Sequence, residues 1–317
     1  MENFDTIYSQ IKTSSSIQTL YKKNLALKIG LSILFIAFIL FFIVPFDILL
    51  FKIITLICTL ILIVSFLYKF HLPSYSTAYK KEVVSKLIEM YDANFKYFAD
   101  SLISVDLYKS ADFEQDFNEF HSEDGICGVF QGTYPFLMGE VKTSKVETYV
   151  DSDGKTHKSR TTLFNGFFIK LTMKKSLPCT IYIRRKYPFS NSFSKRTKNI
   201  AYKNFSQADT NKIQMDDSEF EKIFYVETNN QILTMQLFTL HSLQQLVDFK
   251  KFYKLIPEIT IKDSTIFIRF FTRGQIFEPP ALKSPLDYKE VQKECKFVDS
   301  IMNICKNMIN NIENLEI

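Results

Sequence analysis

The segment Glu123-Asp124-Gly125, together with the later Glu140, contains the acidic residues best placed for acid–base chemistry. Two carboxyl groups can share such work when one is protonated and the other is ionised near a substrate. Adjacent side chains of an extended chain point in opposite directions, which favours an acidic turn with Gly125 at the bend. We therefore favour a non-enzymatic role and keep an enzyme that uses Glu123, Asp124 and Glu140 as an alternative.

A second group of chemical interest is basic and begins at the end of a predicted strand. Its members are Arg184, Arg185, Lys186, Lys195, Arg196, Lys198 and Lys203. Near an anionic membrane surface each such cation contributes about 1 kcal/mol of attraction. We therefore predict that these residues contact anionic lipid headgroups or a protein partner, and the alternative is an exposed charged loop. We expect no nucleic acid, because a membrane tether would make lipid the nearer anion.

The remaining polar residues match no metal or cofactor motif. The run Asp151-Ser152-Asp153-Gly154 lacks the closing glutamate of a calcium loop, because Arg160 stands at that position. The four histidines lie far apart, and no two cysteines have the Cys-x-x-Cys spacing. Glycine-rich phosphate loops and the signatures of serine hydrolases and kinases are absent from the sequence. The sequence therefore predicts no catalytic residue, no metal and no cofactor.

The elements that must position these residues begin with an apolar stretch from Ile29 to Leu67. A helix that crosses a bilayer needs about 20 apolar residues. We predict a transmembrane helical hairpin with spans at about 25–45 and 48–68, because a turn at Asp47 keeps its carboxylate out of the hydrocarbon. A signal peptide would start with a basic region, and a soluble core helix would carry a polar face, so both alternatives fit less well.

Lysines flank this predicted hairpin at both outer ends, with Lys22, Lys23 and Lys28 before it and Lys69 after it. Because cations favour the cytoplasmic side, we expect a two-span protein of the bacterial inner membrane with both termini in the cytoplasm. The five cysteines are scattered along the chain, as expected in a reducing compartment. The formal net charge of +5 is modest and does not diagnose nucleic-acid binding.

The predicted fold class is α+β, with the hairpin followed by a mostly antiparallel β domain, an internal helix and a long C-terminal helix. We expect a short amphipathic cytoplasmic lead at 1–24, the transmembrane hairpin at 25–70 and a membrane-proximal helical segment at 74–124. A cytoplasmic α+β domain should occupy residues 125–317.

Alternation of apolar and polar residues predicts the strands of this domain. They should cover Val129–Tyr134, Glu140–Val150, Thr161–Leu171, Cys179–Arg184 and Phe220–Thr228. A turn at Asp153-Gly154 should follow the second strand, because glycine tolerates positive φ. A second hairpin is expected between Glu258 and Phe271, with its turn at Lys262-Asp263-Ser264.

Two helices complete the predicted domain, an internal one at about Gln231–Phe252 and a C-terminal one at about Leu286–Ile312. Apolar residues of the second helix recur at spacings of three and four, as in a coiled-coil seam. The seam consists of Tyr288, Val291, Cys295, Val298, Met302, Cys305, Ile309 and Ile312. We expect this seam either to form a homo-oligomer or to pack on the sheet of its own domain.

Short motifs occur along much of the chain: Glu123-Asp124-Gly125 with Gly128, Glu140, Phe164-Asn165-Gly166-Phe167-Phe168, the set Phe220, Phe224 and Val226 followed by Leu233-Thr234, then Phe267 and Phe277-Glu278. In these motifs the chain resembles a bacterial family catalogued as domain of unknown function 3137 (DUF3137). The resemblance implies two membrane spans near the N-terminus and a cytoplasmic α+β domain. The family has a proline after the Leu-Thr pair, whereas this chain has Met235. No activity or catalytic residue comes with the resemblance.

These expectations together favour a membrane-anchored cytoplasmic domain with an interaction or regulatory role. Its ligand would be an anionic lipid headgroup or a protein partner. The alternatives are a membrane-associated enzyme that uses the three acidic residues and a small oligomeric transporter or channel subunit.

Overall fold

The computed structural model describes most of the chain outside its N-terminal apolar stretch. The described residues are 4–12, 15–43, 75–100, 102–186, 210–272, 277–279, 284 and 286–315, with six single positions between 53 and 64. The chain divides into two compact units. The first comprises residues 1–87 and 277–293, and the second comprises residues 88–276 and 294–317.

The N-terminal part of the first unit is helical where the structure describes it. Its helices are α1 (Phe4–Lys12), α2 (Ser15–Ile43), α4 (Tyr75–Tyr79) and the π-helix η1 (Lys80–Val84), after which α5 (Ser85–Tyr91) leads into the second unit. The hydroxyl of Tyr8 donates a hydrogen bond to the carbonyl oxygen of Leu286 at 2.7 Å, and Lys80 forms an ion pair with Glu278 at 2.8 Å. These contacts join the N-terminal helices to residues 277–293.

The predicted transmembrane hairpin is wrong. Among the residues that the structure describes, no helix combines the length and the apolarity that a membrane span requires. Helix α2 contains Lys22, Lys23 and Lys28. The second predicted span, 48–68, lies almost entirely outside the described residues. The predicted localisation as a two-span protein of an inner membrane is therefore wrong as well.

The second unit contains one antiparallel sheet. Its strands are β1 (Lys96–Phe98), β2 (Glu119–Phe130), β3 (Tyr134–Val150), β4 (Thr156–Arg185), β5 (Asn211–Ile213), β6 (Phe224–Thr228) and β7 (Pro257–Phe271). Their order is β1-β2-β3-β4-β6-β5, and β7 also pairs with β4. Strand β4 is central, with β7 along one edge from Gly166 to Ile183 and with β3 and then β6 along the other edge. The predicted antiparallel β domain is thus confirmed.

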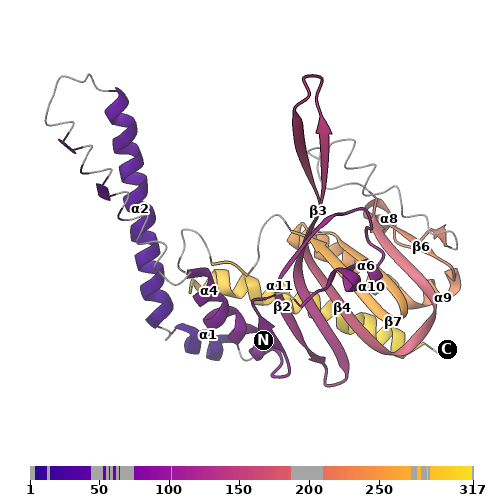
Figure 1. Ribbon diagram of the computed structural model, residues 1–317. Coiled ribbons are helices and arrows are strands. Elements are labelled where there is room, and N and C mark those ends of the chain that lie inside the picture. Colours follow the sequence, from indigo (N-terminus) through magenta and orange to yellow (C-terminus); the bar gives the residue numbers. More distant parts are fainter. Residues whose placement is uncertain are drawn as a thin grey trace. The chain divides into compact units, whose positions relative to one another are not determined.

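Helices cover both faces of this sheet (Figure 1). The helices of the second unit are α6 (Val105–Ser110), α8 (Ser218–Ile223), α9 (Gln231–Leu237), α10 (Leu240–Tyr253) and most of α11 (Tyr288–Glu313). Phe168 of β4 packs in a core cluster with Tyr108 of α6 and with Phe113. The adjacent Phe167 lies 6.1 Å from Phe297 of α11, measured between ring centroids. Because neighbouring side chains of a strand alternate, α6 and α11 contact opposite faces of the sheet.

The predicted bounds of three elements are wrong. The region predicted as a hairpin from Glu258 to Phe271 is one strand, β7, because a bulge with Asp263 at φ +53° lets it follow β4 without turning back. The predicted strand Val129–Tyr134 contains the turn between β2 and β3, where Gln131 and Gly132 take positive φ. The internal helix is divided near Phe238, and the side chain of Thr239 caps α10.

The turn predicted at Asp153-Gly154 is present, with Gly154 at φ +77°. It ends a two-stranded arm in which Ser144–Val150 pairs with Thr156–Thr162 beyond the main sheet (Figure 1). The Oδ1 atom of Asp151 accepts hydrogen bonds from the backbone N–H groups of Asp153 and Lys155, which holds the turn closed.

The seam of the C-terminal helix packs within its own chain. Its residues Val298, Met302 and Cys305 are buried, and Phe297 beside them packs on Phe249 of α10 with 6.3 Å between ring centroids. A coiled coil through this seam would require α11 to leave the sheet that it covers.

Candidate functional site

The structure brings the three predicted acidic residues together. Glu123 of β2 pairs directly with Glu140 of β3, and a shift of register follows between Glu123 and Ile126. Asp124 stands in this β-bulge with φ +52°. One carboxylate oxygen from each of the three residues lies within 4.8 Å of those of the other two. Asp124 and Glu140 are buried, whereas Glu123 is partly exposed. We call Glu123, Asp124 and Glu140 the acidic cluster.

A close approach of two backbone segments positions this cluster. The segment around β1 lies against β2, where a Cβ atom on Gly128 would stand 2.4 Å from the carbonyl oxygen of Asn94. Glycine is therefore required there for the two segments to approach. The approach brings the hydroxyl of Tyr97 to Asp124, to which it donates a hydrogen bond. Adjacent side chains of a regular strand point to opposite faces of the sheet. Asp124 departs from this alternation because the bulge redirects its side chain.

Of the predicted basic residues, the structure describes only Arg184, Arg185 and Lys186, and these three do not form an exposed basic surface. The side chains of Arg184 and Arg185 are buried, with 1% and 4% exposed. Lys186 is exposed and forms an ion pair with Glu221 at 2.8 Å. Lys195, Arg196, Lys198 and Lys203 lie outside the described residues. The predicted contact of this set with lipid or a partner stays a prediction, and the two buried arginines have another role.

That role is an ion network on the α6 side of the sheet, which we call the arginine network and which consists of Arg184, Arg185, Arg269, Glu114 and Glu258. Arg269 donates hydrogen bonds to Glu258 at 2.7 Å and to Glu114. Arg185 lies 3.4 Å from the carboxylate of Glu258, and its guanidinium stacks 3.7 Å from the centroid of the Phe271 ring. Arg184 donates to the hydroxyl of Thr260 at 2.8 Å.

Burial and charge oppose each other in this network. Burial lowers the pKa of Arg184 to about 10. Burial by itself would raise the pKa of Glu258, but the three nearby arginines outweigh it, and the pKa lies below its usual value of 4.5. Glu114 and Glu258 likewise raise the pKa of Arg269 although burial opposes this. The ion pairs of Arg269 with both glutamates and of Arg185 with Glu258 therefore offset part of the cost of burying these charges.

Comparison with known proteins gives a partial family match. The family described as "Protein of unknown function (DUF3137)" matches residues 162–309. This region runs from β4 into α11 and contains Arg184, Arg185 and Arg269, whereas the acidic cluster precedes it. The resemblance seen in the sequence is thus supported over this region, and the match gives no support to its implied membrane spans or bacterial origin.

No curated protein matches the chain. Among solved structures, the crystal structure of the mycobacterial trehalose monomycolate transport factor A, TtfA, is similar over 70% of this chain and 92% of that chain. Its identity is 8% and its TM-score is 0.31, so this likeness supports no functional inference.

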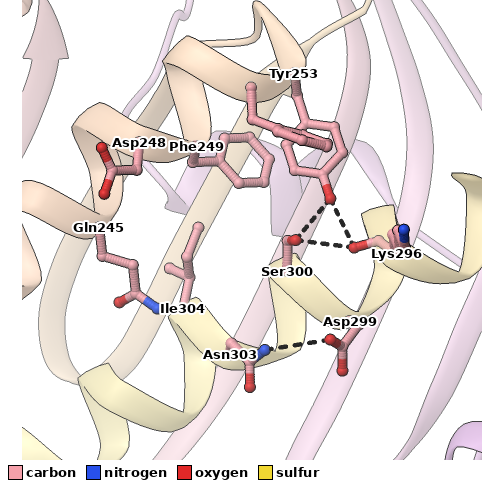
Figure 2. A pocket seen from close by; sticks show the side chains of 10 residues that line it. Gln245, Asp248, Phe249, Tyr253, Lys296, Asp299, Ser300, Asn303 and Ile304 are labelled. Carbon is pink, nitrogen blue, oxygen red and sulfur yellow. Dashed lines mark hydrogen bonds between the residues drawn. The ribbon is translucent and has the colours of Figure 1, made fainter. Parts of the chain in front are cut away.

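A site that the sequence did not indicate lies between α10 and α11 (Figure 2). This α10/α11 pocket has a volume of about 440 Å³. Three aromatic residues of α10 line it, namely Phe249, Phe252 and Tyr253. The hydroxyl of Tyr253 donates a hydrogen bond to the backbone oxygen of Lys296 at 2.7 Å and lies 2.7 Å from the hydroxyl of Ser300. These contacts join the two helices at one end of the pocket.

Polar side chains form the rest of the lining. Gln245 and Asp248 belong to α10, and Asp299 and Asn303 belong to α11. Gln245 accepts a hydrogen bond from Asn307 at 2.9 Å, which fixes a second point between the helices. The ten lining residues include no histidine or cysteine, and the Ser300 hydroxyl contacts Tyr253 and the backbone oxygen of Lys296. The lining thus combines aromatic side chains with acidic, amide and hydroxyl groups.

The sequence feature that could have drawn attention to this pocket is the aromatic pair Phe252-Tyr253, which lies at the predicted end of the internal helix and directly after it. Phe252 is 72% exposed, because the buried stripe of α10 lies on the other side of that helix. A sequence places both aromatic residues near the helix end, but only the packing of α11 shows that they border a cavity.

Proposed function

We propose that the second compact unit is a non-catalytic binding module that holds a partner at the α10/α11 pocket. The observation that carries the proposal is a pocket of about 440 Å³ whose wall includes Phe252, a large aromatic side chain that is 72% exposed. Exposed aromatic residues beside a cavity are typical of binding sites. This proposal keeps the interaction role expected from the sequence, without the membrane anchor.

The rigidity of the pocket supports the same proposal. Tyr253 and Gln245 each contact α11, at 2.7 Å and 2.9 Å, so the two helices are joined at both positions. A pocket that is already formed loses less conformational entropy when a ligand binds. Both helices also pack on the sheet through buried aromatic residues such as Phe249 and Phe297.

Site-specific photocrosslinking in the native cells tests this proposal. A photoreactive phenylalanine derivative replaces Asn303, which lines the pocket, and in a matched chain it replaces Asn310, an exposed residue of the same helix outside the pocket. We expect a discrete adduct from position 303 that is absent from position 310. The same adducts at both positions, or none at position 303, would overturn the proposal.

A second candidate function is acid-assisted chemistry at the acidic cluster. Three carboxylates within 4.8 Å of one another favour this candidate, because a divalent cation held between them would offset their negative charge. The chain has no tryptophan, so luminescence of bound Tb³⁺ would be excited through Tyr97, which contacts Asp124.

We expect Tb³⁺ emission from the intact chain and its loss in the variant Glu123→Gln with Glu140→Gln. The control Asp151→Asn removes a partly exposed acid near Tyr149 at the tip of the arm and should leave the emission unchanged. Equal emission from all three proteins would reject a cation site at the cluster, and so would no emission from the intact chain.

A further inference from the structure

The aromatic side chains of the α10/α11 pocket form a continuous wall. The ring centroids of Phe252 and Tyr253 are 4.7 Å apart in a T-shaped arrangement, and those of Phe249 and Tyr253 are 4.8 Å apart. Figure 2 shows Phe249 and Tyr253 extending from α10 towards α11. Aromatic faces carry partial negative charge, so such a wall attracts cations as well as apolar groups.

The charged residues of the lining favour a cation too. Asp248 lies on α10 and Asp299 on α11, whereas Lys296 is the one basic residue of the lining. The pocket therefore has a local charge of about −1 in a chain whose formal net charge is +5. Lys251 of α10 does not line the pocket and forms an ion pair with Glu219 at 2.6 Å, although its charge also interacts with that of Asp248.

The electrostatic effect of Asp299 reaches the aromatic wall. The pKa of Tyr253 is raised, chiefly by burial; the hydrogen bond with Ser300 opposes this, and the negative charge of Asp299 adds a smaller increase. The carboxylate of Asp299 therefore acts on the ring that joins the two helices, and it also accepts a hydrogen bond from Asn303 at 3.5 Å. A ligand beside Tyr253 would experience the same negative potential.

We propose that the α10/α11 pocket binds an organic cation, an alkylammonium or guanidinium group that stacks on Phe252 and Tyr253 between Asp248 and Asp299. This inference rests on the proposed function and specifies its ligand class. An anion is disfavoured because two aspartates and only one lysine line the pocket. A purely apolar ligand would leave Gln245, Asn303 and both aspartates desolvated without a charge to compensate them.

Titration of the full chain with choline and with 3,3-dimethylbutan-1-ol, its neutral isostere, tests the ligand class by ligand-observed NMR. We expect choline to bind about tenfold more tightly than the alcohol, because cation–π attraction and the aspartates act only on the charged molecule. Choline binding should weaken as NaCl rises from 20 mM to 500 mM, since salt screens the aspartates. N-acetyl-arginine amide, the second probe, tests whether the cation can come from a protein side chain.

The variant Asp248→Asn with Asp299→Asn should weaken binding of both cations by about tenfold, while Asp216→Asn, an exposed aspartate outside the pocket, should have no effect. Circular dichroism confirms that each variant is folded. Equal affinity for choline and the alcohol would overturn the cation inference and leave the proposed function intact. Absence of choline and arginine binding would overturn the inference as well, and the crosslinking at position 303 would still test the proposed function independently.

Discussion

On the α6 side of the sheet, three arginines and two glutamates are buried, whereas over the opposite face the aromatic ring of Phe252 is exposed to solvent. The two regions lie over opposite faces of one sheet. Charged side chains are usually exposed and aromatic ones usually buried, and here each region shows the opposite. Buried charges are stable only with ionised partners in place, so the arginine network depends on each of its members. An exposed ring makes no comparable contribution to folding, so Phe252 can be altered at little cost in stability.

The largest expected effect follows from removal of one buried charge. Arg269→Met leaves Glu114 and Glu258 without their shared partner and should lower the free energy of unfolding by about 3–5 kcal/mol. The matched variant Arg160→Met breaks an exposed ion pair with Glu119 and should cost less than about 1 kcal/mol. Urea unfolding measures both. Similar losses of unfolding free energy in the two variants would show that the buried ion network contributes no more to stability than an exposed ion pair does.

The arginine network should also make stability depend on pH. The pKa of Glu258 lies below its ordinary value of 4.5, so its ionised form stabilises the folded state. That stabilisation is fully present above pH 4.5 and is lost as the pH falls through the lower pKa of the folded state. The difference in unfolding free energy between wild type and Glu258→Gln should therefore shrink as the pH falls below 4.5. Glu119→Gln is the exposed control, and a constant difference for Glu258→Gln would contradict the prediction.

A smaller effect is expected where the pocket joins α10 to α11. Tyr253→Phe removes the hydroxyl that contacts Ser300 and the backbone of Lys296 and should cost about 1 kcal/mol of stability. Tyr149→Phe, at the exposed tip of the arm, should change stability by less than about 0.5 kcal/mol. Thermal unfolding distinguishes the two, and equal midpoints would show that the hydroxyl of Tyr253 does not join the helices.

The smallest stability effect belongs to the exposed ring itself. Phe252→Ala should change the free energy of unfolding by less than about 0.5 kcal/mol and yet weaken choline binding several-fold. Ile232→Ala provides the control, because Ile232 is 73% exposed on α9 and does not line the pocket. A large loss of stability in Phe252→Ala would show that the pocket wall is part of the core after all.

The candidate sites differ in how far the sequence could predict them. Glu123, Asp124 and Glu140 were recognised as a candidate acidic group, but their meeting depends on a β-bulge and on the approach of Asn94 to Gly128. Arg184 and Arg185 were placed on a basic surface because charged residues at a strand end are usually exposed. Their partner Glu258 is more than 70 residues away in sequence, and only the pairing of β4 with β7 brings it near.

The apolar N-terminal stretch shows a different limit. Composition alone suggested two membrane spans, yet no described helix is long and apolar enough for a span, and α2 contains three lysines in its first half. A count of apolar residues along the chain does not show which of them belong to one continuous helix, and a membrane span requires them in one helix.

The amino-acid sequence by itself determined the antiparallel β domain, the turn at Asp153-Gly154 and the long C-terminal helix, because period and turn residues act over a few neighbouring positions. Only the tertiary structure decided that the seam of α11 packs on its own sheet, that β7 continues past Asp263 and that Arg269 lies between two glutamates. These outcomes depend on contacts between residues far apart in the chain, and local patterns carry no information about which distant surface a side chain will meet.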